Sequence, residues 1–236
     1  ELDGYIYVRP TTATGGPDTP WRLPAHAQPG YRTVRLVNRF ENSVTNCAEN
    51  FIDIPHTVFV HPGIFRTPRR QRIEATVTRR DGVVEATYRG ETDNLGWFRW
   101  FLNPGGQPIE HVDRFISPNV TSVEYRFGPR RHFFITSQCV PVGPEETLVY
   151  TDLTFDYGAF NLLAGPIVRW QGQRVVDQDL VALRRQQEVI RRYGSTFSNS
   201  PCDIIHVFVE SLRGALARGD DPRALPERTR DIVFWV

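Results

Sequence analysis

The strongest constraint on the fold is a series of alternating segments between residues 71 and 155. Apolar and polar residues alternate along residues 71–90 on both sides of Asp81-Gly82, a pair that favours a tight hairpin turn. About seven strands in succession predict an α+β fold, in which one curved antiparallel sheet has helices packed against it. Clusters of Gly, Pro and Asn separate the later segments, which cover residues 97–102, 111–116, 121–127, 131–140 and 147–155.

Helical patterns take over after the last of these strands. Residues 160–170 are apolar enough for a buried helix, and residues 178–193 form an amphipathic pattern that ends at Gly194, a suitable C-cap residue. Ser200 and Pro201 suit the N-cap and the first position of a third helix. We therefore predict that helices gather near the C-terminal end of the chain.

The two ends of the chain carry further signals. Residues 2–8 alternate as a strand would, and residues 10–30 are rich in Pro, Gly and Thr, which predicts an extended connection. Residues 31–40 alternate again and predict another strand. The last residues, 231–236, predict a final strand or a packed tail.

Length and composition predict one domain, residues 1–236. A hydrophobic share of 40% is typical of globular chains, and the formal net charge of +1, with dispersed Arg residues, argues against nucleic-acid binding. No apolar run approaches the roughly 20 residues that span a bilayer, and no signal peptide opens the sequence, so we expect a cytoplasmic protein without membrane contact. Cys47, Cys139 and Cys202 form no CxxC pair and are predicted to be buried thiols.

The segment 49–61, ENFIDIPHTVFVH, concentrates polar groups that suit a metal site. Asn50, Asp53 and His56 follow at three-residue steps, which places them on roughly one face of a helix. Pro55 excludes an undisturbed helix, so we expect a short helix, bent or broken there, that brings His56 and His61 to one point. Two neutral imidazoles and a carboxylate from elsewhere suit an open Fe(II) site.

The complete string N-x-x-D-x-x-H-x-x-x-x-H resembles the iron-binding segment of Rieske-type non-haem iron oxygenases. These are the terminal oxygenases of aromatic-ring hydroxylating and O-demethylating systems. The resemblance implies that His56 and His61 bind the iron and that Asn50 lies near it. It also implies that Asp53 bridges to a histidine of the Rieske cluster on a neighbouring subunit.

The same resemblance implies a third ligand, a carboxylate far along the chain. The segment VVDQDLVALRRQQEVI looks like the family's acidic segment. Asp179 is favoured over Asp177, because the family's ligand tends to be the last acid before the apolar helical residues. A second reading of Asp179, as an acid that stabilises the first turn of a helix, stays open.

The resemblance further implies a helix-grip (START-like) architecture, in which the sheet wraps a long helix and the space between them holds substrate. Nine aromatic residues are candidates for the pocket lining, although for each one taken separately ordinary core packing is the favoured reading. The five preferred are Trp97, Trp100, Phe134, Phe155 and Phe160, and the others are Phe98, Phe101, Phe133 and Tyr157. No role in the chemistry is assigned to His26, His111, His132 or His206.

A Rieske 2Fe-2S cluster needs paired C-x-H and C-x-x-H motifs, and neither occurs here. We expect the Rieske domain to be missing from this chain, and the opening residues ELDGYIYVRP resemble its last strand, so that residues 1–30 would be left from the junction. The resemblance implies a homotrimer that uses O₂, a mononuclear Fe(II), a reductase or ferredoxin and an apolar ring substrate. The product would be a cis-diol, a phenol, a demethylated ether or a hydroxylated alkyl carbon.

Two other functions remain open from the sequence. The helix-grip fold also serves as a metal-free carrier of hydrophobic ligands, although a carrier does not need an acid beside buried imidazoles. Zinc-dependent hydrolysis is a weaker alternative, because no general base is evident.

Overall fold

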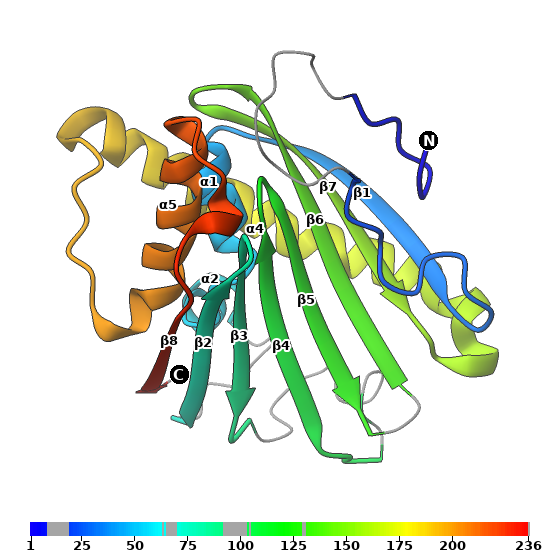
Figure 1. Cartoon of the computed structure of the whole chain (residues 1–236). Coiled ribbons are helices and arrows are strands. Elements are labelled where there is room, and N and C mark those ends of the chain that lie inside the picture. The colour runs from blue at the N-terminus through cyan, green and yellow to red at the C-terminus, as the bar shows by residue number, and fades with distance from the viewer. Residues whose placement is uncertain are drawn as a thin grey trace.

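The computed structural model of the protein describes residues 1–8, 19–62, 64, 70–91, 103, 105–128 and 131–235. Within this part, eight strands form one curved antiparallel sheet with the order β1-β7-β6-β5-β4-β3-β2-β8 (Figure 1). The predicted sheet is confirmed, while the predicted strand at 97–102 lies outside the described residues. In spatial order the strands are β1 (Arg32–Phe40), β7 (Glu146–Phe155), β6 (Arg131–Gly143), β5 (Val120–Phe127), β4 (Ile109–Ile116), β3 (Val83–Arg89), β2 (Arg72–Arg80) and β8 (Arg228–Trp235).

The hairpin between β2 and β3 turns where the sequence predicts it. Asp81 and Gly82 both have positive φ, at 51° and 76°, which is the conformation of the tight turn that matches the twist of the two strands. β8 pairs with the outer side of β2, which confirms a final strand near residues 231–236. The C-terminal strand β8 therefore forms one edge of the sheet, next to β2.

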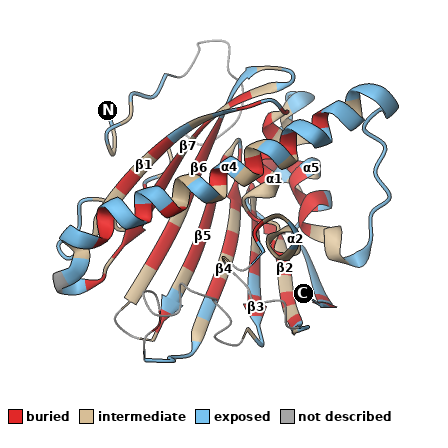
Figure 2. Ribbon diagram, turned by 180° about the vertical axis from the view of Figure 1, so that it is seen from behind, coloured by how far each residue is buried: buried red, intermediate tan, exposed pale blue. Residues whose placement is uncertain are grey.

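The helices lie on one face of the sheet (Figures 1 and 2). The longest, α4, crosses the strands with its buried residues toward the sheet and its exposed residues toward solvent (Figure 2). Within the described residues, no helix is both long and apolar enough to cross a bilayer. The helices are α1 (Val44–Asn50), α2 (His56–Val60), α4 (Asn161–Tyr193) and α5 (Ile204–Ala217), the last preceded by a short 3₁₀ turn at Pro201–Asp203.

Helix α4 corrects the prediction of two separate helices at 160–170 and 178–193. It is one helix of 33 residues with Pro166 inside it. A proline frees the carbonyl four residues earlier, which here is Leu162. The guanidinium of Arg32 donates to that carbonyl at 3.3 Å, and Gly165 leaves room for it, because a Cβ there would lie 2.9 Å from the guanidinium. The helix therefore continues through the proline and ends at Gly194, as predicted.

Helix α4 approaches the sheet most closely near its middle. A Cβ on Gly172 would lie 2.6 Å from Cδ1 of Leu153 on β7 and 3.2 Å from Cδ1 of Leu36 on β1. Only glycine allows this approach without repacking. Both leucines belong to the main hydrophobic core, which fills the space between the sheet and the helices.

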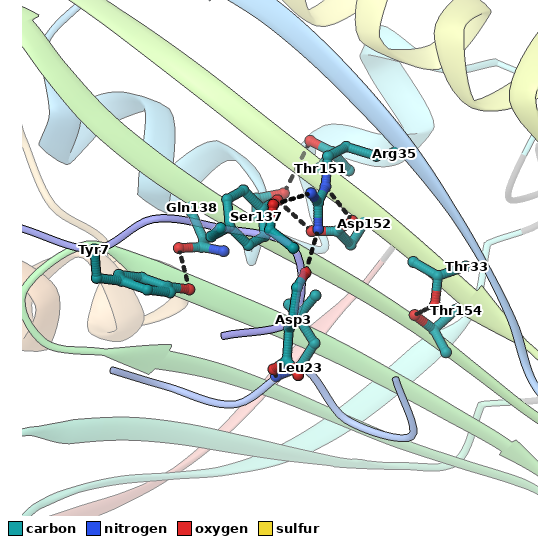
Figure 3. A network of polar contacts seen from close by, with 12 residues as sticks. Asp3, Tyr7, Leu23, Thr33, Arg35, Ser137, Gln138, Thr151, Asp152 and Thr154 are labelled. Carbon is teal, nitrogen blue, oxygen red and sulfur yellow. Dashed lines mark hydrogen bonds and ion pairs between the residues drawn. The ribbon is translucent and has the colours of Figure 1, made fainter. Parts of the chain in front are cut away.

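The N-terminal segment lies on the opposite, outer face of the sheet (Figures 1 and 3). Arg35 on β1 pairs with Asp152 on β7 at 2.8 Å and donates to the carbonyls of Asp3 and Gly4 at 2.9 and 3.2 Å. The hydroxyl of Tyr5 also donates to Asp152. The predicted strand at residues 2–8 is wrong, because Asp3 and Gly4 have positive φ and form a turn held by these contacts.

Candidate metal centre

The centre begins at the break between α1 and α2. Ile52 and Ile54 in this break are buried in the core, which anchors the connection. Pro55 has a φ of −53° and is the N-cap residue of α2, and its missing backbone N–H keeps the first helix from running through it. The carboxylate of Asp53 accepts a hydrogen bond from the backbone amide of His56 at 3.2 Å and so caps the new helix. The break near Pro55 is as the sequence predicts.

Hydrogen bonds fix how the two imidazoles face each other. Nδ1 of His56 donates to the backbone carbonyl of Asp53, and Nδ1 of His61 donates to Oε1 of Gln178 on α4 at 2.8 Å. Both acceptors are oxygens without a proton to give, so the ring protons reside on Nδ1. Each Nε2 therefore directs a lone pair inward, and the two Nε2 atoms are 3.3 Å apart.

Asp179 on α4 completes the cluster. Its Oδ1 lies 3.1 Å from Nε2 of His61 and 3.7 Å from Nε2 of His56. The residue is 2% exposed, and this oxygen receives no hydrogen bond from the described residues. Burial, together with the neighbouring His61, lowers the pKa of His56 against the opposite effect of Asp179, which favours the neutral imidazole that a metal requires.

These donors fit a divalent cation. The ligand atoms of His56, His61 and Asp179 all lie within 4.8 Å of one another. Metal–ligand bonds of about 2.1 Å place neighbouring donors roughly 3 Å apart, close to the separations in this cluster. Two imidazoles and one carboxylate are a donor set that suits Fe(II) with open positions. Asp177, the other candidate ligand, is exposed and instead accepts a hydrogen bond from Gln173 at 2.8 Å.

Two further predicted site residues lie beside this cluster. The Asp53 side chain is 38% exposed. The protein around it still removes enough water from the carboxylate to raise the pKa of Asp53 to about 7, with a smaller contribution from the charge of Glu49. The side-chain nitrogen of Asn50 is buried without a hydrogen-bond partner among the described residues. Both residues line the same pocket as the three ligand candidates.

That pocket has a volume of about 980 Å³ including its open mouth, and it extends between α4 and the inner face of the sheet. Its lining is mainly apolar and aromatic, and the aromatic side chains include Phe133 and Tyr157 from the wider set of candidates. Phe134 contacts Tyr31 and His132 instead, because successive side chains of a strand point to opposite faces. Phe155 is fully buried against Tyr157 in the core.

Three more of the preferred aromatic residues do not belong to the described lining of the pocket. Phe160 is 65% exposed, at the start of α4. Trp97 and Trp100 lie outside the described residues. The predicted lining is therefore corrected for Phe134, Phe155 and Phe160, each of which lies outside the described lining of the pocket.

The sequence analysis missed a second polar cluster in the same pocket. His111 lies between Asp113, at 2.8 Å, and Glu91, at 3.1 Å. His111 and Asp113 are two residues apart on β4 and therefore share one face of the sheet. The signal that could have found them is the pattern HVD inside a predicted strand, which puts an imidazole and a carboxylate side by side.

Comparisons with known proteins agree with this description. A model of the vanillate O-demethylase oxygenase C-terminal domain matches residues 41–205. Among curated proteins, none matches the chain. Dicamba monooxygenase bound to 3,6-dichlorosalicylic acid shares 18% identity and a TM-score of 0.69, over 82% of this chain and 61% of that one.

Two structures from Pseudomonas putida CBB5 are also similar. NdmB shares 15% identity and a TM-score of 0.65, over 90% of this chain and 60% of that one. NdmA with caffeine shares 14% identity and a TM-score of 0.66, over 90% of this chain and 61% of that one. These likenesses show a common fold with chains of which ours spans about 60% of the length. The family match covers most of the sequence, and the chain therefore belongs to the family of vanillate O-demethylase oxygenase C-terminal domains.

Proposed function

We propose that this chain is the catalytic domain of a terminal oxygenase, in which His56, His61 and Asp179 hold one Fe(II). The observation that carries the proposal is the convergence of their three lone pairs on one point beside an apolar pocket. The reaction would be hydroxylation, dihydroxylation or demethylation of an apolar ring substrate. Proteins of the same fold have been solved with ring compounds, dicamba and caffeine, in their structures.

The bound iron would supply coordination positions at which O₂ is reduced. The protein's own contribution is to hold the ligands still: the carbonyl of Asp53 and the amide of Gln178 keep both imidazoles in the required tautomer. The apolar lining keeps water from the reacting groups. Monohydroxylation consumes O₂, two electrons and two protons and releases one water, so an external electron donor is required.

Asp53 is the proposed entry point for these electrons. It is bonded to the backbone of His56, and its side chain is still partly exposed, so a group from another subunit can reach it. A carboxylate between His56 and an imidazole of a Rieske 2Fe-2S cluster would hold the two centres in register. This role requires the cluster on a domain or chain outside this sequence, a neighbouring subunit in a homotrimer, and a reductase or ferredoxin.

Iron content under anaerobic conditions tests the proposal. The wild-type chain should bind about one Fe(II), as a single mononuclear site requires. The variants His61→Ala and Asp179→Asn should lose it, whereas the matched variant Asp177→Asn, which removes the same charge two residues away, should keep it. Loaded wild-type protein with a reduced electron donor should then consume O₂ in the presence of ring substrates.

The same experiment distinguishes the alternatives. A chain that binds apolar ligands but no metal, in either wild-type or variant form, would be a carrier of hydrophobic ligands. A chain that prefers Zn(II) and hydrolyses esters without O₂ would be a hydrolase. Either result would refute the oxygenase.

A further inference from the structure

The side-chain amide of Gln171 is a polar group in the pocket that the metal centre does not use. The residue is 6% exposed, belongs to the buried face of α4 and lines the pocket. No described residue donates to its amide or accepts from it, and neither its nitrogen nor its oxygen is closed off from the pocket. A molecule in the pocket can therefore reach both a hydrogen-bond donor and an acceptor on this side chain.

Two other glutamines nearby on α4 use their amides within the protein. The nitrogen of Gln173 donates to Asn38 and to Asp177, at 2.8 Å in each case. The oxygen of Gln178 accepts from His61, also at 2.8 Å. A buried amide without such partners destabilises a folded chain, so packing alone does not account for Gln171. An occupant of the pocket that supplied the missing hydrogen bonds would remove that cost.

The wall of the sheet near Gln171 is apolar. At the next residue, Gly172, the helix lies against Leu153 of β7. The strand register continues this row through Ile135 on β6 and Val123 on β5, and all three side chains line the pocket. A flat ring could therefore lie on an apolar surface while its edge meets one amide. Few polar groups around an apolar volume are the usual means by which a pocket orients a small molecule.

Gln171 and the metal centre lie along one side of the helix that crosses the strands (Figure 2). Gln171, Val175 and Asp179 follow one another at four-residue steps, and all three line the pocket. The first and the last are eight residues apart, about 12 Å along the helix axis. A ring whose edge is bonded to Gln171 would extend over Val175 and turn its opposite edge toward Asp179.

We propose that Gln171 binds the ring substrate through a neutral group that has a donor and an acceptor side by side, as in a lactam or a carboxamide. Such a group pairs with the nitrogen and the oxygen of the amide together, whereas an ester or an ether leaves the amide oxygen without a donor. This inference deepens the proposed function and rests on it by taking the pocket as the substrate site. Gln171 would decide which edge of the ring faces the metal centre.

The binding of two isosteric probes tests this inference without turnover. 2-Quinolinone is a lactam, and coumarin is the same ring system with an oxygen in place of the N–H group. Isothermal titration calorimetry of the purified chain should show 2-quinolinone binding at least about threefold more tightly than coumarin, because one further hydrogen bond forms. Gln171→Met keeps the length of the side chain and removes the amide, so coumarin should then bind at least as tightly as 2-quinolinone.

Gln173→Met is the matched control, because it makes the same change two residues away, outside the described lining of the pocket. It should keep the preference for 2-quinolinone within about twofold of that of wild type. Urea unfolding should show that Gln173→Met is destabilised, because the bonds to Asn38 and Asp177 are lost. Gln171→Met should be at least as stable as wild type, because it removes an amide without partners.

Four results would overturn the inference. These are equal binding of the two probes to wild type, no binding of either probe, a preference that survives in Gln171→Met, and a Gln171→Met chain that does not fold. The wild-type comparison needs no variant and is therefore decisive by itself when the two affinities are equal.

Iron content measured on the same preparations separates this inference from the proposed function. A wild-type chain with stoichiometric iron and no preference for 2-quinolinone would overturn the role of Gln171 and leave the oxygenase standing. A chain without iron that prefers 2-quinolinone, and that loses this preference in Gln171→Met, would refute the oxygenase and support the role of Gln171.

Discussion

Replacing Asp179 by Asn should stabilise the metal-free protein while removing its metal site. The carboxylate is 2% exposed, and its Oδ1 faces the unprotonated Nε2 atoms of His61 and His56 at 3.1 and 3.7 Å. This oxygen receives no hydrogen bond from the described residues, and a buried acceptor without a donor costs about 1–3 kcal/mol. Asparagine has the same shape, carries no charge and can donate to an Nε2, so most of that cost should disappear.

The expected gain in unfolding free energy is therefore about 1–3 kcal/mol for chelator-treated protein. For a chain of this size each kcal/mol corresponds to about 2–4 °C in Tm. Asp177→Asn is the matched control on the same helix, since Asp177 is exposed and already accepts a hydrogen bond from Gln173. Its stability should change by no more than about 0.5 kcal/mol.

Metal addition should raise the stability of wild type relative to that of Asp179→Asn. At one hundred times its Kd, a bound cation stabilises the folded chain by about 2.7 kcal/mol. Wild type and Asp177→Asn should show this increase with anaerobic Fe(II) or with Co(II), a redox-stable probe, and Asp179→Asn should not. Thermal unfolding, followed by circular dichroism, measures the stability of each variant without and with the metal. A metal-free Asp179→Asn that is less stable than wild type, or one that keeps the metal-induced shift, would refute the reasoning.

Three further predictions concern electron entry, the core and acid stability. Asp53→Asn should retain iron but lose most of its O₂ consumption with the reduced Rieske partner, and unchanged consumption would contradict the bridging role. Phe115→Ala, at a fully buried position, should cost about 3–5 kcal/mol in urea unfolding. Burial raises the pKa of Glu124, but Arg114 and Arg126 lower it overall. The stability from these pairs is therefore fully present above 4.5, the ordinary pKa of a glutamate, and is lost as the pH falls through the lowered pKa of Glu124. We expect Arg114→Met to be destabilised at pH 7, and its difference in stability from wild type should shrink as the pH falls below 4.5.

Local chemistry made much of the fold predictable. The Asp81-Gly82 pair fixes a hairpin because both residues accept positive φ, and alternation fixes the strands on either side. Helix α4 could not be read in full, because the bond that rescues the carbonyl freed by Pro166 comes from Arg32, more than a hundred residues away. The turn at the N-terminus was missed for the same reason, since Arg35 on a distant strand holds it.

In the candidate site, too, local features could be predicted from the sequence and contacts between distant segments could not. The spacing of His56 and His61 around Pro55 is local, so the sequence could indicate their convergence. The pocket depends on which face each strand turns inward, and an error of one residue exchanges Phe133 for Phe134. The pattern HVD places Asp113 beside His111, but Glu91, the second carboxylate partner of His111, comes from a separate segment, so the complete cluster could not be predicted from local sequence.

Helix α4 joins two parts of the molecule that an engineer would wish to change separately. Gly172, against the sheet, and Asp179, beside the imidazoles, are seven residues apart on one rigid rod, about 10 Å along its axis. A bound molecule large enough to push α4 away from the sheet at Gly172 would also move the Asp179 side chain away from His61. Space for bulkier ligands should therefore be made by shortening side chains on the strands, because such a change leaves the position of α4 unaltered.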